Sequence, residues 1–177
     1  MTSIPEVLRA LNRARVRYLL IGGYASVLHG VPRTTLDLDL ALHPEPANVR
    51  RALAALERLG LHTETNRVDE VLAQGGVTVS NDRSVDLLTS VRGSPFSHLW
   101  RRRITVRIPG ARIPVVSRRD QVRLLRAAGR PKDLEDAEAL ESVEDDCTAW
   151  SPAKEHARDL RRADSLESAP SREPCPL

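Results

Sequence analysis

The heptapeptide LDLDLAL, which starts at Leu36, alternates leucine with aspartate. A period of two residues is typical of a β-strand, because successive side chains of a strand point to opposite faces of a sheet. We therefore expect Leu36, Leu38 and Leu40 to face the core. Asp37 and Asp39 should then project together from the other face, about 6.6 Å apart. Two carboxylates that converge in this way are suited to holding a magnesium ion, which prefers oxygen ligands.

A glycine pair, Gly22-Gly23, precedes the first aspartate by a spacer of thirteen residues. The segment RYLLIG before it predicts a short buried strand, and the residues up to Gly30 predict a short helix. Backbone N–H groups exposed where a helix begins are suited to binding a triphosphate. A glycine pair is also common in tight turns that bind nothing, so this motif alone leaves both interpretations open.

A third carboxylate, Asp86, lies in a predicted short strand over 85–88 that could lie next to the first aspartates. Three acidic ligands can hold two metal ions about 3.5 to 4 Å apart, which aligns an attacking hydroxyl with the α-phosphorus of a nucleoside triphosphate. Each motif has a plain structural explanation, such as a solvated strand face or a surface carboxylate. Their combination in this order favours metal-dependent phosphorus chemistry.

The rest of the chain alternates helices with short strands. A capping box, SIPE, begins a first helix at Ser3 that should continue to about Arg15. Further strands are expected over 61–65, 77–80, 104–108 and 113–116, and further helices over 44–59, 97–102, 117–129 and 131–142. This order predicts an α+β fold, a small mixed sheet flanked by helices, with C-terminal helices.

Composition limits the domain organisation. A chain of 177 residues with 41% hydrophobic residues can bury one compact core, which we expect to span residues 1–146. Residues 147–177 contain few large apolar side chains and several Pro and Ser, which predicts a disordered or loosely attached tail. No stretch is apolar enough for a membrane span or a signal peptide, so we expect a cytoplasmic protein without a membrane partner.

Charge is unevenly distributed along the chain, whose formal net charge is +3. Arginines cluster over 101–103 and 118–130, and an acidic segment follows. Two alternatives to an enzyme use these clusters: a non-catalytic RNA-binding or regulatory module, and a partner-binding module such as an antitoxin-like subunit. Arg118 and Arg119 are the candidate contacts to a polyanionic acceptor. The presence of all three aspartates favours the enzyme.

The glycine pair, the spacer and Asp37-Leu38-Asp39 resemble the pattern of the nucleotidyltransferase superfamily that shares the DNA polymerase beta catalytic core. Asp86 lies where that superfamily has its third carboxylate. The stretches VDLL and AAGRPKDLEDAEAL further resemble a small bacterial branch related to AbiEii-type toxins. These toxins usually carry a lysine in the helix before the RPKD-like turn, where this chain offers Arg123 and Arg126; arginine can also bind phosphate, bidentately. The resemblance covers about residues 18–140.

The resemblance implies a metal-dependent nucleotidyltransferase that moves a nucleoside monophosphate from an NTP to a hydroxyl of tRNA or protein, as the toxin of a toxin–antitoxin system with a possible cognate antitoxin. Asp37, Asp39 and Asp86 would be catalytic and would bind two Mg²⁺ ions. Arg33 and Thr34 either reach the nucleotide phosphates or are solvated loop residues. The full set of residues expected to bind the nucleotide is Gly22, Gly23, Tyr24, Arg33, Thr34, Arg126, Lys132 and Asp136.

Overall fold

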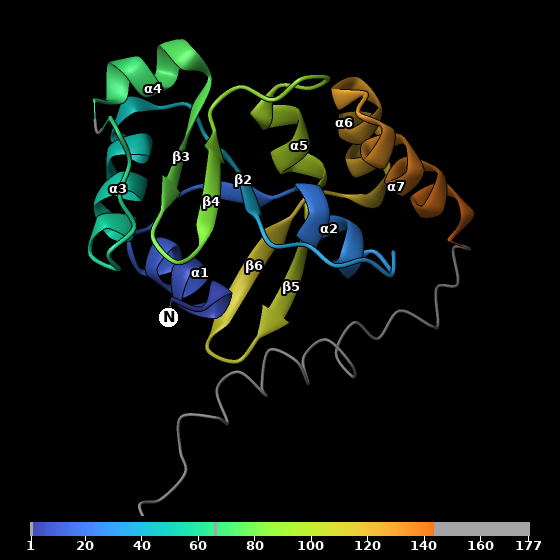
Figure 1. The fold of residues 1–177 in the computed structure, drawn as a ribbon, viewed down its shortest axis with the longest axis horizontal. Coiled ribbons are helices and arrows are strands. Elements are labelled where there is room, and N and C mark those ends of the chain that lie inside the picture. Colours follow the sequence, from blue (N-terminus) through green and yellow to red (C-terminus); the bar gives the residue numbers. More distant parts are fainter. Residues whose placement is uncertain (1, 66, 144–177) are drawn as a thin grey trace, which may run out of the picture. The chain divides into compact units, whose positions relative to one another are not determined.

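Six strands form one mixed sheet in the computed structural model, which describes residues 2–65 and 67–143 (Figure 1). Their order in the sheet is β3-β4-β2-β1-β6-β5. The strands are β1 (Tyr18–Leu20), β2 (Leu38–Leu42), β3 (Gly76–Ser80), β4 (Ser84–Leu88), β5 (Ile104–Ile108) and β6 (Ala111–Val115). β2 is parallel to β4 and β1 is parallel to β6, whereas the other neighbours are antiparallel. The predicted α+β class with a small mixed sheet is confirmed.

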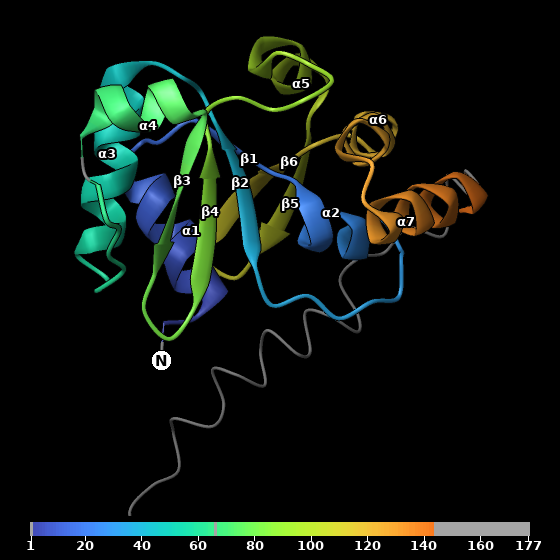
Figure 2. The same cartoon turned by 45° about the horizontal axis from the view of Figure 1, so that its top comes forward.

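Helices flank the sheet, and the pair α1 and α3 lies across the fold from the pair α6 and α7 (Figure 2). The helices in the described residues are α1 (Ile4–Arg13), α2 (Gly22–Leu28), α3 (Pro46–Glu57), α4 (Val68–Gln74), α5 (Phe96–Arg102), α6 (Arg118–Ala128) and α7 (Pro131–Ser142). The predicted capping box begins α1, since Ser3 and Glu6 each accept a backbone N–H of the other. No helix among the described residues is long and apolar enough to cross a membrane.

The centre of the sheet is buried on both faces. Leu38 and Leu40 of β2 have no exposed surface, as predicted, but the consecutive residues Ala41 and Leu42 are buried as well. The alternation of the sequence therefore ends at Leu40, because side chains from both faces of β2 are covered beyond that point.

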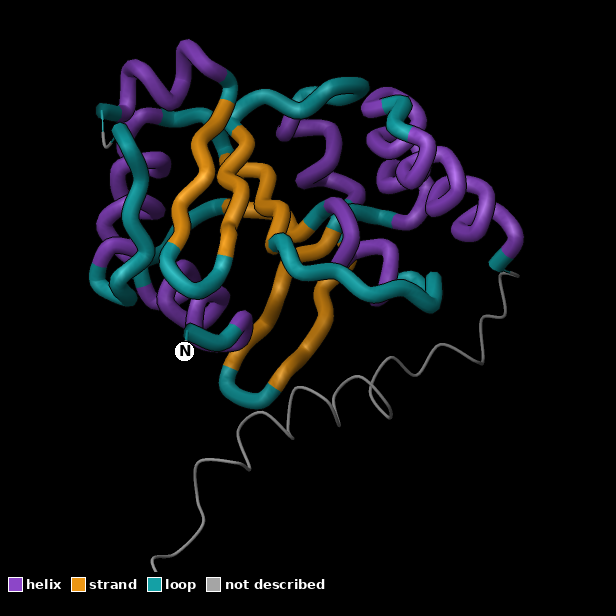
Figure 3. Tube along the Cα trace, viewed as in Figure 1, coloured by secondary structure: helices purple, strands orange, loops and turns teal. Residues whose placement is uncertain are grey.

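The prediction that Leu36 faces the core is wrong, because its side chain is 82% exposed. β2 begins only at Leu38, where pairing with Val85 of β4 starts. Residues 29–37 form a long loop between α2 and β2, drawn in teal in Figure 3. Asp37 therefore directly precedes the strand, whereas Asp39 lies within it. The alternation of side chains between two faces applies only from Leu38 onward, because the residues before it form a loop.

The segment before β3 also differs from the prediction. The expected strand over 61–65 is wrong, because only His62 bridges to Ser80 at the sheet edge. The short helix α4, which the sequence did not predict, follows it and ends at Gln74, directly before Gly75, whose φ is 82°. α4 buries only Val71 among its residues, so it carries too little apolar periodicity to be found from sequence. The predicted boundary at 146 and the predicted tail lie outside the described residues.

Candidate active site

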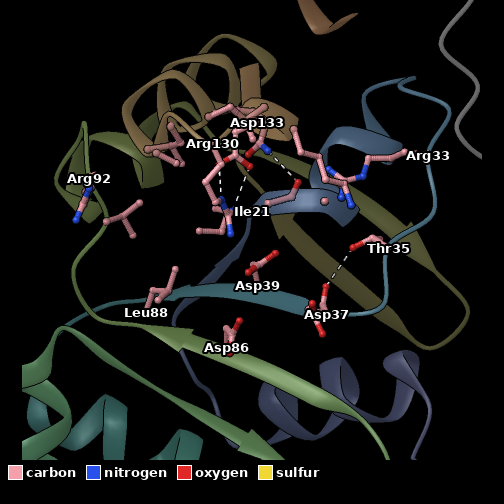
Figure 4. A pocket seen from close by; sticks show the side chains of 18 of the residues that line it. Ile21, Arg33, Thr35, Asp37, Asp39, Asp86, Leu88, Arg92, Arg130 and Asp133 are labelled. Carbon is pink, nitrogen blue, oxygen red and sulfur yellow. Dashed lines mark hydrogen bonds and ion pairs between the residues drawn. The ribbon is translucent and has the colours of Figure 1, made fainter. Parts of the chain in front are cut away.

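Parallel pairing of β2 with β4 brings two of the predicted aspartates together. Asp39 lies opposite Asp86 in the register of the two strands. Neighbouring strands are about 5 Å apart, so the two carboxylates share one edge of a cavity. That cavity, of about 460 Å³, is also lined by Asp37 and by both glycines of the turn, Gly22 and Gly23. Figure 4 shows the three aspartates along the strands on one side of this cavity.

The surroundings of Asp39 in the site raise the pKa of its carboxyl group. Burial, followed by the nearby negative charge of Asp86 and that of Asp37, raises its pKa from 3.8 to about 6. A hydrogen bond from the backbone of Gly23 and the positive charge of Arg130 oppose the rise in pKa without cancelling it. The carboxylates therefore hold negative charge that the described residues only partly compensate, which is the condition that a bound cation relieves.

We expect Asp39→Asn to stabilise the metal-free protein at neutral pH and not in acid. The folded protein holds a proton on Asp39 up to about pH 6, whereas the unfolded chain releases it near 3.8, so the free energy of unfolding falls as pH rises through that window. The variant removes this loss, which amounts to at most about 3 kcal/mol above pH 6. Urea denaturation of both proteins with EDTA, in acid and at neutral pH, measures the effect. An equal difference at both pH values would contradict it.

The glycine pair is required because the turn lies against the aspartate loop and strand. A Cβ on Gly22 would lie 2.6 Å from Cγ of Asp39, and Gly22 has a φ of 65°. A Cβ on Gly23 would lie 2.9 Å from the Cβ atom of Thr35. The carbonyl of Gly22 accepts a hydrogen bond of 2.8 Å from Nε2 of Gln121, a fully buried residue of α6. The turn is thus held against Asp39 from one side and by α6 from the other.

Gly22→Ala is expected to destabilise the protein more than Gly60→Ala. Both positions have positive φ, 65° and 74°, so each alanine pays a backbone cost of about 1 kcal/mol. Only Gly22 has a neighbour in the path of the new methyl group, since nothing lies within 4 Å of the Gly60 position. Urea denaturation of the two variants isolates the contact with Asp39. Equal losses would mean that the turn can move away from Asp39 freely.

Cationic side chains line the same cavity. Among the described residues these are Arg33, Arg92, Arg130 and Lys132. Arg130 forms a bidentate ion pair with Asp133, at 2.6 and 3.1 Å, and hydrogen bonding to Asp133 is the main reason that its pKa is raised. Arg33 forms an ion pair with Asp136. In Figure 4, Arg33 and Arg130 lie across the cavity from the three aspartates. Such a cavity can hold a polyanion and a cation together.

The sequence predictions cover this lining only in part. Gly22, Gly23, Arg33 and Lys132 line the cavity, whereas Arg92, Arg130 and Gln121 line it without having been predicted. Arg130 could have been found as the residue directly before the helix start at Pro131, and no sequence signal marks Arg92 or Gln121. The predicted residues that do not line it are Tyr24, Thr34, Arg126 and Asp136.

These other predicted residues have contacts elsewhere. Tyr24 is partly buried, which raises its pKa, and the nearby positive charge of Arg83 opposes that rise. Thr34 is exposed, and its carbonyl accepts a weak hydrogen bond from Nε of Arg33 at 3.4 Å. Arg126 forms an ion pair of 2.7 Å with Glu141 of α7. Their predicted contacts with nucleotide stay predictions.

The donor set fits a magnesium ion that arrives with its substrate. Among the described residues, no group of three or more His, Cys, Asp or Glu side chains is close enough to hold a metal by itself. Mg²⁺ is usually bound by one or two carboxylates, with water and substrate phosphates as its other ligands. Asp37 and Asp39, which line the same cavity, meet that requirement. The predicted number of two ions stays a prediction.

No protein-family model matches the sequence, and no curated protein matches it significantly. Solved structures do match. The lincosamide antibiotic adenylyltransferase LnuA, in its lincomycin-bound crystal structure, is 19% identical, with a TM-score of 0.57 over 81% of this chain and 99% of that one. The chain has a nucleotidyltransferase fold.

Two structures of ANT(2'')-Ia give the same result. Its solution structure, described as that of an antibiotic-resistance factor, is 16% identical with a TM-score of 0.54, over 92% of this chain and 91% of that one. The crystal structure in complex with adenylyl-2''-tobramycin is 18% identical with a TM-score of 0.53, over 93% and 97%. At identities this low, the structural likeness shows the fold alone. The AbiEii-related branch stays a prediction from sequence.

Proposed function

We propose that this protein is a metal-dependent nucleotidyltransferase that moves a nucleoside monophosphate from an NTP to an acceptor hydroxyl. One observation carries the proposal: a single cavity on a nucleotidyltransferase fold holds Asp37, Asp39 and Asp86 on one side and basic side chains on the other. A triphosphate with its magnesium needs both sets of charges at once. A binding module without chemistry would have no evident use for three aspartates in the lining of one cavity.

The roles of the residues follow from their positions. Asp37 and Asp39 would hold Mg²⁺, which when bound neutralises phosphate charge and polarises the α-phosphate. Arg33, Arg130 and Lys132 would bind the phosphate oxygens from the opposite wall. Arg130 is already held in place by Asp133, so its guanidinium is oriented before the nucleotide binds.

The reaction is an in-line displacement at phosphorus. The oxygen of the acceptor hydroxyl forms a bond to the α-phosphorus, and the bond from that phosphorus to the bridging oxygen of pyrophosphate breaks. Asp86 takes the proton of the hydroxyl, and pyrophosphate leaves with the bonding electron pair. Catalysis comes from positioning and charge neutralisation, and no covalent intermediate on the protein is required.

The finer parts of the proposal rest on the sequence resemblance. It favours a cytoplasmic toxin that modifies tRNA or protein and is controlled by an antitoxin. The structural relatives named above carry lincomycin and adenylyl-2''-tobramycin instead, which are small molecules. A non-catalytic RNA-binding module remains the competing function, and it would rely on the arginines of α6.

The decisive test is incubation with each α-labelled NTP and Mg²⁺, in the presence of total tRNA or of a small-molecule extract. We expect magnesium-dependent release of pyrophosphate and label in one acceptor fraction. EDTA should abolish both signals. NTP binding that is absent, or that is unaffected by Mg²⁺ in a calorimetric titration, would contradict the proposal.

A further inference from the structure

A second cavity, of about 1110 Å³, is lined by β3, by β4 and by the segment that precedes α4. It shares Asp86 and Leu88 with the candidate active site. The two cavities therefore meet at Asp86, the carboxylate to which the proposed reaction assigns the proton of the acceptor. A molecule in the second cavity could present a hydroxyl to a nucleotide bound in the first.

The wall of the second cavity also orients Asp86. Thr78 lies opposite Asp86 in the antiparallel pair of β3 and β4, and its hydroxyl donates a hydrogen bond of 2.6 Å to Oδ1 of Asp86. Thr78 lines the second cavity and does not line the first. One oxygen of Asp86 is thus fixed from this side, which leaves the other oxygen to accept a proton.

The two cavities differ in charge, because basic side chains accompany the carboxylates in the lining of the first cavity only. No arginine or lysine is among the described residues that line the second cavity, and its carboxylates are Glu64 and Asp86. Glu64 is exposed and forms no ion pair with any residue in the described part of the chain. A polyanion placed here would bring phosphates against unpaired carboxylates. Arg118 and Arg119, the predicted contacts to such an acceptor, line neither cavity.

We propose that the second cavity binds the acceptor, and that this acceptor is a small hydroxyl compound with at least one positive charge. The inference rests on the proposed function, because it uses Asp86 as the proton acceptor. Ser80 and Thr65 are polar residues of the same lining, although the hydroxyl of Thr65 is already hydrogen-bonded to Glu70. The buried hydroxyl of Thr63, in the same lining, has no hydrogen-bond partner among the described residues. In the transfer, the acceptor oxygen bonds to the α-phosphorus, its proton passes to Asp86, and pyrophosphate leaves.

Direct binding tests the cavity without requiring turnover. Tobramycin and glucosamine, two cationic hydroxyl compounds, serve as probes in calorimetric titrations. We expect wild type to bind at least one of them, and Glu64→Gln to weaken that binding about 5- to 10-fold, with a larger loss for Glu64→Lys. Glu138→Gln, which removes an exposed carboxylate of α7, should bind like wild type. Failure of both probes to bind, or unchanged affinity in both Glu64 variants, would overturn the inference.

Transfer separates this inference from the proposed function. With α-labelled NTPs and Mg²⁺, we expect label on the small cationic probe and none on total tRNA, with the Glu64 variants raising the acceptor KM while NTP affinity stays within about twofold. Label on tRNA alone would overturn the acceptor class and leave the nucleotidyltransferase standing. An NTP that fails to bind would overturn the proposed function itself, and the acceptor site with it.

Discussion

Asp39→Asn is expected to reduce nucleotidyl transfer about 1000-fold or more, because it removes a carboxylate that would hold Mg²⁺ and that lies against the glycine turn. Loss of a magnesium ligand costs several kcal/mol of transition-state stabilisation, and each 1.4 kcal/mol is about tenfold in rate. Single-turnover transfer with saturating NTP and Mg²⁺ measures the effect. The same change should raise the free energy of unfolding at neutral pH, so a loss of activity cannot be explained by unfolding.

A matched control is available on the surface. Asp69→Asn removes an exposed carboxylate of α4 whose partner is Arg67, and it should leave transfer unchanged. If Asp39→Asn kept more than about a tenth of the wild-type rate, the carboxylate would not serve the metal. Asp39 would then be a buried acid retained for another reason.

Local features of the site could be predicted from sequence because they depend on neighbours along the chain. The glycine pair predicts a strand that turns into a helix, and the structure has β1 ending just before α2 at Gly22. Leu38 and Leu40 predict a strand with a buried face, which is confirmed. These patterns reflect backbone conformation and side-chain direction, both of which are set within a few residues.

Pairing between distant strands could not be predicted in the same way. The sequence indicated only that the strand of Asp86 could lie near the first aspartates, whereas the register places Asp86 directly opposite Asp39. A shift of one residue in that register would turn Asp86 to the other face of the sheet. The burial of Val85 and Leu87, both fully buried, fixes the register by favouring the one in which Asp86 points to the cavity.

The basic residues that line the first cavity are the part of the site that is hardest to predict from sequence. The sequence predicts a nucleotide contact for Arg126 and none for Arg130, although both lie near the turn between α6 and α7. α6 ends at Ala128, and Gly129, with a φ of 71°, redirects the chain so that Arg130 caps α7 beside the cavity. Arg126 stays on α6 and pairs with Glu141. Which arginine reaches the site therefore depends on how two helices dock, and a charge pattern along the sequence does not contain that information.

Asp86→Asn should separate chemistry from nucleotide binding. Asp37 and Asp39 would hold the metal that arrives with the triphosphate, whereas Asp86 lies where the two cavities meet and serves the acceptor hydroxyl. We therefore expect the variant to bind NTP within about threefold of wild type and to transfer at least about 100-fold more slowly, the loss typical of a positioned proton acceptor. Calorimetric titration with NTP and single-turnover transfer measure the two quantities.

Thr78→Val is the companion variant, because it removes the hydrogen bond that orients Asp86 and keeps the carboxylate itself. It should slow transfer by about tenfold, less than Asp86→Asn does, since the freed carboxylate still accepts a proton in a fraction of its orientations. A positioning role also predicts that the loss in Thr78→Val falls on the transfer rate, while NTP affinity stays within about threefold of wild type. Equal losses of NTP affinity and of transfer in Asp86→Asn would contradict this role. Asp86 would then be a ligand of the Mg²⁺ that arrives with the NTP, and another group of the second cavity would have to accept the proton.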